Sequence, residues 1–206
     1  MFSRKRNNPL IFIPYDSVLG NCAVKNLYNI SGAEKVNHIL VEESKNSVWD
    51  HLTPLRKFNI SKFILIAHPH NSSKPDLHLN PIEANSIPID WWYGSNTSNI
   101  ELLYAHVCSG SDILNSEMWS QVFPNWVSYN KDIHMSYGTR RTKKITKSLV
   151  SDIKKSVQEC NTAHELESLL IKVFDNYIYR LQSQRKRGDR FRIMLIQQLK
   201  NNLISS

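Results

Sequence analysis

The chain has 206 residues, of which 41% are hydrophobic and 21% are charged, and its net charge at pH 7 is +8. This length suits one domain, or one domain with an appendage, and the composition is that of a soluble globular protein. No apolar run approaches the roughly 20 residues of a membrane-spanning helix, so we expect no membrane contact. The four apolar residues from Leu10 to Ile13 are too few for a signal peptide, and we expect none.

The three cysteines, Cys22, Cys108 and Cys160, are scattered along the chain. They fit neither a disulfide framework nor the paired spacing of a zinc site. Because disulfides are rare in reducing compartments, we expect an intracellular, cytoplasmic protein. No pattern indicates a cofactor.

Short apolar runs alternate with helical patterns over the first two thirds of the chain. Buried strands are predicted at residues 10–14, 36–41, 62–67 and 100–107. Helices are predicted at 19–30 and 47–58, and the Asn-, Ser- and Pro-rich residues 71–99 predict a long surface loop. This alternation indicates an α/β fold, with a mostly parallel central sheet and helices on both faces.

Beyond residue 138 the pattern becomes helical. Thr162 and Glu165 form a capping box, and an apolar face follows from Leu166 to Leu181. A last helix carries Phe191 and Leu199 among its apolar residues. We predict an α/β domain at residues 1–138 and an all-helical C-terminal extension, residues 139–206, packed on the same core.

Two of the predicted strands end in reactive side chains. The third runs into IAHPHN, with His68 and His70, and the fourth into YAHVCSG, with Cys108. In open parallel sheets, ligands bind outside the carboxyl ends of the strands. If these strands are parallel neighbours, a histidine lies near the thiol. The imidazole can then take the thiol proton, and the thiolate can attack a carbonyl carbon.

The segments FILIAHPHN and LLYAHVCSG resemble those of the caspase-like cysteine peptidases of clan CD. Members of that family place the catalytic histidine just after the third strand, usually as His-Gly. They place the cysteine just after the fourth strand, often as Ala-Cys followed by small residues. The resemblance covers roughly residues 9–138, through the order of elements more than through letters. It implies a caspase-like fold and a cysteine endopeptidase that cleaves a protein substrate with Cys108 and a histidine.

The histidine motif departs from the family pattern. Pro69 follows His68 and has no backbone N–H to offer an oxyanion, whereas Asn71 follows His70 and keeps one. We therefore favour His70 as the catalytic base, with His68 as the alternative. The backbone N–H groups of Asn71 and Ser109 are the predicted oxyanion donors.

Other residues are weaker candidates for contact with a substrate. Asp16 and Asp90 suit a pocket for a basic side chain, although a solvated loop carboxylate is the commoner case. Trp91 and Trp92 lie between the two motifs and suit a substrate groove, although such pairs more often anchor a loop. His106 is expected to have a structural role.

Two alternative functions stay open. His68, His70 and His78 are a candidate metal set for a hydrolase, but no second half-site is evident nearby. The other alternative is a catalytically inactive caspase-like module that docks a protein activator or a partner chain through its C-terminal helices. Its basic stretches, residues 140–144 and 180–190, suit an acidic partner. Nucleic acid is the less favoured partner, because helix ends often carry solvated cations.

Overall fold

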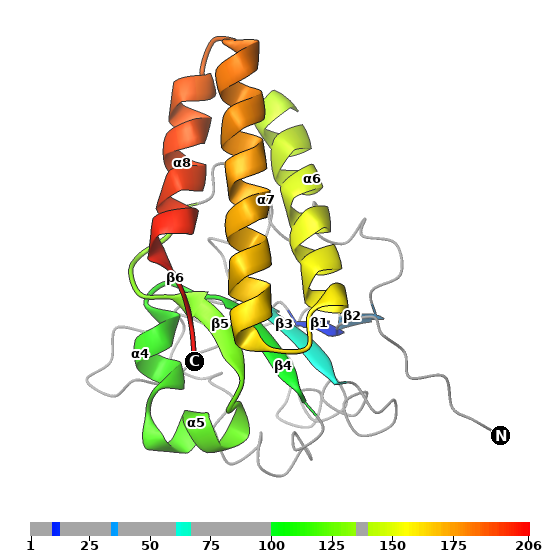
Figure 1. The fold of residues 1–206 in the computed structure, drawn as a ribbon, viewed down its shortest axis with the longest axis vertical. Coiled ribbons are helices and arrows are strands. Elements are labelled where there is room, and N and C mark those ends of the chain that lie inside the picture. Colours follow the sequence, from blue (N-terminus) through cyan, green and yellow to red (C-terminus); the bar gives the residue numbers. More distant parts are fainter. Residues whose placement is uncertain (1–9, 13–33, 37–60, 67–99, 135–139) are drawn as a thin grey trace, which may run out of the picture.

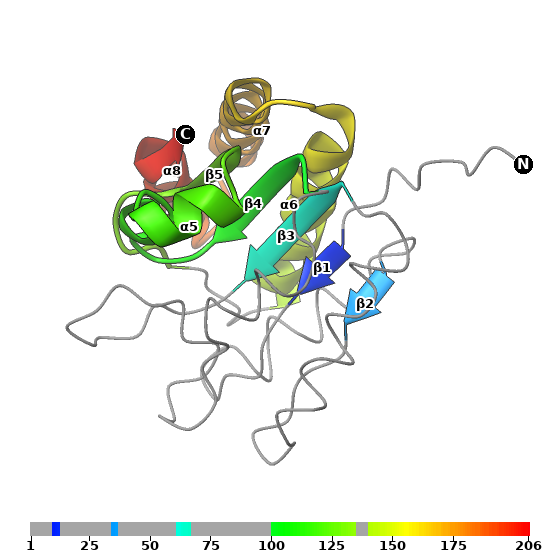
Figure 2. The same ribbon diagram turned by 90° about the horizontal axis from the view of Figure 1, so that it is seen from below.

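The computed structural model describes residues 10–12, 34–36, 61–66, 100–134 and 140–206. These residues form a six-stranded sheet with helices on both of its faces (Figures 1 and 2). The strands are β1 (Leu10–Phe12), β2 (Glu34–Val36), β3 (Lys62–Ile66), β4 (Leu102–His106), β5 (Trp126–Tyr129) and β6 (Leu203–Ser205). The helices are α4 (Gly110–Leu114), α5 (Glu117–Val122), α6 (Arg140–Glu159), α7 (Ala163–Gln184) and α8 (Asp189–Asn202). The predicted α/β class is confirmed.

The sheet has the strand order β2-β1-β3-β4-β5-β6. β1 to β5 pair in parallel, and only β6 is antiparallel to its neighbour. The prediction of a mostly parallel sheet is therefore confirmed. β3 and β4 are direct neighbours, and their register runs from Lys62 opposite Leu102 to Ile66 opposite His106. The carboxyl ends of these two strands consequently meet at one edge of the sheet.

One face of the sheet packs against α6, α7 and α8. Alternate strand residues point to this face, among them Ile64, Tyr104 and Val127, and all three are buried. The helices contribute apolar residues three or four positions apart: Leu149, Ile153 and Val157 from α6, Leu166, Leu170 and Phe174 from α7, and Ile196 and Leu199 from α8. Each fully buried large apolar side chain contributes roughly 1.5–3 kcal/mol, so this layer binds the three helices firmly to the sheet.

The opposite face packs against α4 and α5. Phe63 from β3 stacks on Phe123, whose ring centroid lies 6.1 Å away, and Phe123 stacks in turn on Trp119 of α5 at 6.0 Å. Leu103 and Trp126, which pair across β4 and β5, are also buried. The alternation along each strand thus supplies two apolar layers, as a sheet covered on both faces requires.

Two side chains set the direction of α6 and α7 relative to the sheet. Lys62, the first residue of β3, donates to the carbonyls of Gln158 and Cys160 at the end of α6, at 2.6 Å each. Asn125, just before β5, accepts from the N–H of Ala163 at the start of α7, at 2.7 Å. α6 therefore runs antiparallel to β3, and its first turn lies on the side of the carboxyl ends of the strands.

The C-terminal segment departs from the all-helical prediction. Residues Leu203–Ser205 form β6, which pairs with β5, and the N–H of Ser206 donates to the carbonyl of Trp126 at 3.0 Å. A three-residue strand is too short to show an alternating pattern, and it forms because the chain leaves α8 beside the open edge of β5. The prediction of an all-helical extension is wrong for these residues.

The remaining predictions about elements have mixed outcomes. The strand predicted at 36–41 is described only as β2, which begins two residues earlier, at Glu34. The helices predicted at 19–30 and 47–58, the loop at 71–99 and the boundary at 138 lie outside the described residues. The capping box at the start of α7 is present, with the N–H of Glu165 donating to Thr162 Oγ1 at 3.2 Å. Among the described residues, no helix has the length and apolar character that a membrane crossing needs.

Candidate functional site

Cys108 lies in a tight turn between β4 and α4. Ser109, the next residue, has a left-handed backbone with φ of 50°, and the N–H of Gly110 donates to the carbonyl of Val107 at 3.2 Å. A Cβ atom at position 110 would collide with Oγ of Ser128 on β5, so the turn requires glycine here. The thiol is thus held at the carboxyl end of β4 by a turn that is packed against the neighbouring strand.

The thiol of Cys108 is partly exposed and is bound to the backbone of Ile133. Its Sγ donates to the carbonyl of Ile133 at 3.5 Å and accepts from the N–H of the same residue at 3.4 Å. Burial raises the pKa of the thiol above its ordinary value, and the nearby carboxylate of Asp132 raises it further, against the lowering effect of the Ile133 hydrogen bond. Cys108 is therefore a neutral thiol at neutral pH.

Ser109, one of the two predicted oxyanion donors, has its backbone N–H in a hydrogen bond within the protein. Its backbone N–H donates to the carbonyl of Lys131 at 3.2 Å. That bond joins the turn after β4 to the segment after β5, and it occupies the only donor that the Ser109 backbone has. Ser109 would have to give up this bond to donate to an oxyanion, and its role as a donor stays a prediction.

Two buried tyrosines, which the sequence analysis did not single out, link His106 to β5. The hydroxyl groups of Tyr104 and Tyr129 lie 2.7 Å apart, and the Tyr104 hydroxyl lies 3.1 Å from Nδ1 of His106. Burial raises the pKa of both tyrosines well above the usual range. The ring of His106 also meets that of Tyr129 edge-on, with centroids 5.3 Å apart. His106 thus belongs to a row of hydrogen-bonded side chains that reaches Tyr129 on β5.

The other predicted site residues lie outside the described part of the chain. They are His68, His70, Asn71, His78, Asp16, Asp90, Trp91 and Trp92. Within the described ranges, no group of three His, Cys, Asp or Glu side chains is close enough to hold a metal ion. Cys160 is buried in the core beside α6 and α7, and burial raises its pKa.

A second polar feature lies away from Cys108. A groove of about 750 Å³ runs between α6 and α7, and arginine and lysine side chains line both of its walls. It includes residues from the two basic stretches noted in the sequence, 140–144 and 180–190. Comparison of the chain with family models, with curated proteins and with solved structures finds no match.

Proposed function

We propose that the protein is a cysteine endopeptidase with a caspase-like fold, in which Cys108 is the nucleophile and a histidine after β3 is the general base. One observation carries the proposal: β3 and β4 are parallel neighbours. The histidine motif and the cysteine motif therefore leave the sheet at the same edge, where α/β proteins bind their ligands.

The length of the connection supports this pairing of the two motifs. His68 and His70 follow Ile66 by two and four residues in the sequence. Ile66 pairs with His106, two residues before Cys108. Few residues therefore separate either histidine from the paired ends of β3 and β4, and His70 stays the favoured base because Asn71 has the backbone N–H that Pro69 lacks.

The raised pKa of Cys108 favours one form of the mechanism. A neutral thiol needs a base at the moment of attack, so the imidazole takes the Sγ proton as Sγ bonds to the carbonyl carbon of the substrate. The imidazolium then gives that proton to the departing amine, and the acyl group stays on Sγ as a thioester. Water, deprotonated by the same imidazole, hydrolyses the thioester and restores the thiol. The Asn71 N–H is a proposed donor to the oxyanion.

A peptidyl chloromethyl ketone is the probe that tests this proposal, because it alkylates a thiol that a neighbouring base activates. We expect it to label Cys108 of the folded protein and to fail with His70→Ala, while His68→Ala has a mild effect. Loss of a general base costs roughly 10²–10⁴-fold in rate. Cys160→Ser is the matched control, since Cys160 is buried and its loss should leave the labelling unchanged.

Labelling of Cys108 at the rate of a simple thiol, unchanged in both histidine variants, would remove the assignment of Cys108 as a nucleophile. A chelator tests the metal-dependent alternative, since a hydrolase built on His68, His70 and His78 would lose activity to a chelator and keep it in Cys108→Ala.

A non-catalytic binding module is the second candidate function, and the groove between α6 and α7 favours it. Failure of the thiol probe, together with retained binding at the groove, would support the module over the peptidase. One protein can have both functions, because the groove and Cys108 lie on different elements.

A further inference from the structure

The positive charge of the protein is concentrated in its C-terminal helices. Residues 140–206 contain fifteen Lys or Arg and six Asp or Glu, a net charge of +9. The first 139 residues contain eleven basic and twelve acidic residues, a net charge of −1. The excess positive charge of the chain therefore lies on α6, α7, α8 and the turns between them. We expect an anionic partner to bind these helices.

These cations gather around the basic groove between α6 and α7. Its walls are Arg140, Arg141, Lys144, Ile145 and Ser148 from α6, Tyr177, Arg180, Leu181 and Gln184 from α7, and Lys186 from the turn that follows. Ten residues line it, and none of them is acidic. Apolar side chains, among them Ile145 and Leu181, form part of its lining, so a ligand in the groove meets charge with reduced access to water.

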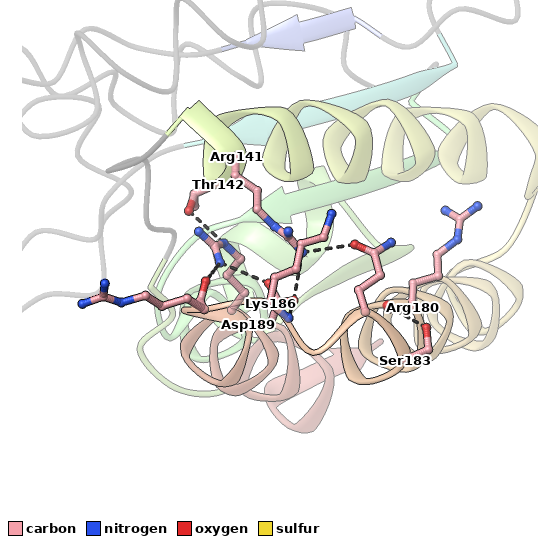
Figure 3. A network of polar contacts seen from close by, with 9 residues as sticks. Arg141, Thr142, Arg180, Ser183, Lys186 and Asp189 are labelled. Atoms are coloured by element: carbon pink, nitrogen blue, oxygen red, sulfur yellow. Dashed lines mark hydrogen bonds and ion pairs between the residues drawn. The ribbon is translucent and has the colours of Figure 1, made fainter.

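A buried carboxylate organises one end of the groove (Figure 3). Asp189 is only 3% exposed and accepts from Arg141 at 2.8 Å, from Arg192 at 3.1 Å and from the N–H of Lys186 at 2.9 Å. Arg141 also donates to Gln184 at 3.1 Å. These bonds tie the first turn of α6 to the turn between α7 and α8, so the groove is preorganised without a ligand.

Three other cations of the groove are exposed on its walls. Within the described residues, no ion pair joins Arg140, Lys144 or Arg180 to a carboxylate, and all three are exposed. Two arginines begin α6, and its first turn has no acidic residue. Cations are unfavourable at a helix N-terminus, where the helix dipole is already positive. A bound anion would relieve this repulsion. Anion binding therefore explains why two arginines lie in the first turn of α6.

An exposed aromatic ring lies next to one of these cations in the sequence. Tyr179 is 72% exposed and precedes Arg180. The two line a second pocket, which shares Tyr177 and Arg180 with the basic groove and also includes Asp152 and Glu159. An exposed ring beside a row of cations is the combination that binds single-stranded nucleic acid, because bases stack on the ring while phosphates meet the charges.

We propose that the basic groove binds single-stranded nucleic acid, with Arg140, Lys144 and Arg180 on the phosphates and Tyr179 under a base. Arg140 and Lys144 are about 6 Å apart along the helix axis, so neighbouring phosphates of one strand can meet both. Arginine also binds phosphate with a bidentate fork. The inference is independent of the peptidase proposal.

Fluorescence anisotropy with a labelled oligothymidylate, over a series of KCl concentrations, tests this proposal. The double variant Lys144→Gln/Arg180→Gln should bind about tenfold more weakly and reduce the slope of log Kd against log [KCl] by about 0.7 for each lost contact. The control Lys131→Gln/Lys172→Gln removes the same charge from exposed positions that do not line the groove. It should change Kd by less than about twofold.

A second pair of variants separates stacking from charge. Tyr179→Ala should weaken binding by about tenfold with an unchanged salt slope, whereas Tyr179→Phe keeps the ring and the affinity. Equal weakening by the groove and control double variants would overturn the proposal, as would the absence of binding at low salt. Tighter binding of a duplex, or of polyglutamate, than of the single strand would overturn the choice of ligand.

Discussion

The thiol of Cys108 is partly exposed, yet burial disfavours its thiolate form. Burial and the carboxylate of Asp132 raise the pKa of the thiol, whereas its hydrogen bond with the backbone of Ile133 lowers it. Catalytic thiols that exist as stable thiolates usually lie next to a positive charge. In the proposed mechanism, the histidine therefore acts as a base during the reaction rather than as a standing ion-pair partner.

The raised pKa predicts how Cys108 reacts with iodoacetamide. Alkylation should be slow at neutral pH and should rise only at a more alkaline pH than in the urea-unfolded chain, because burial disfavours the thiolate in the folded state. By linkage, the thiol also lowers stability as the pH rises from its unfolded pKa toward its folded pKa. Mass spectrometry of the Cys108 peptide over a pH series gives the rate, and Cys108→Ser is the control. Faster alkylation of folded than of unfolded protein at neutral pH would contradict the prediction.

The two buried tyrosines give a matched pair of predictions. The Tyr104 hydroxyl contacts both Tyr129 and His106. Tyr104→Phe removes its hydrogen bond to the buried Tyr129 hydroxyl and should lower the free energy of unfolding by about 1–3 kcal/mol. Tyr129→Phe leaves Tyr104 its bond to His106 and should cost less, about 0.5–1.5 kcal/mol. Urea unfolding of both variants measures the difference. An equal loss of stability in both variants would show that the bond between Tyr104 and His106 does not compensate for the loss of the Tyr129 hydroxyl.

At the scale of elements, the turn after β4 depends on a neighbouring strand. Gly110 begins α4, and the space for a side chain at this position is already filled by Ser128 of β5, whose Oγ donates to the carbonyl of Ala105 at 2.9 Å. The same turn positions Cys108, so the geometry of the candidate nucleophile rests on the contact between Gly110 and Ser128.

Gly110→Ala should destabilise the protein by about 1–3 kcal/mol, because the added methyl group forces β5 and the turn apart. Since the obstacle is the Ser128 hydroxyl, Gly110→Ala/Ser128→Ala should recover part of this loss relative to Gly110→Ala. Thermal unfolding of the four chains, including Ser128→Ala alone, completes the double-mutant cycle. Strict additivity of the two single costs would show that the Ser128 hydroxyl is not the obstacle.

At the scale of the whole molecule, the three long helices reach far from the sheet, and the turn between α7 and α8 lies at the far end (Figure 1). Because α6 runs antiparallel to β3, its basic first turn lies on the side of the carboxyl ends of the strands, the edge where Cys108 is found. The candidate catalytic thiol and the basic groove therefore belong to the same side of the molecule.

Truncation after Ser148 tests how far the sheet depends on these helices. The cut removes most of α6 and all of α7, α8 and β6, and it uncovers Ile64, Tyr104 and Val127. We expect the shortened chain to aggregate or unfold, as seen by size-exclusion chromatography and circular dichroism. A second chain that ends after Asn202 removes only β6 and should stay folded with a lower melting temperature. A monomeric chain ending at Ser148 with an unchanged melting temperature would mean that the helices are an independent module.

Local patterns in the sequence were sufficient for much of the architecture. β3 and β4 were predicted because their apolar runs, FILI and LLYA, pack between two helical layers and so lack polar positions over several residues. The start of α7 was predicted because a capping box is made by side chains three residues apart, Thr162 and Glu165. The position of Cys108 at the end of β4 follows from the same local reading.

Tertiary contacts decided what the sequence left open. β6 exists because α8 delivers Leu203 to the free edge of β5, and Ser109 loses its free N–H because Lys131 is brought beside it. The tyrosine pair joins residues 25 positions apart, and Asp189 meets Arg141 across 48 positions. No local pattern encodes such pairs, since hydrogen bonds and charges act between residues that only the packed sheet and helices bring together.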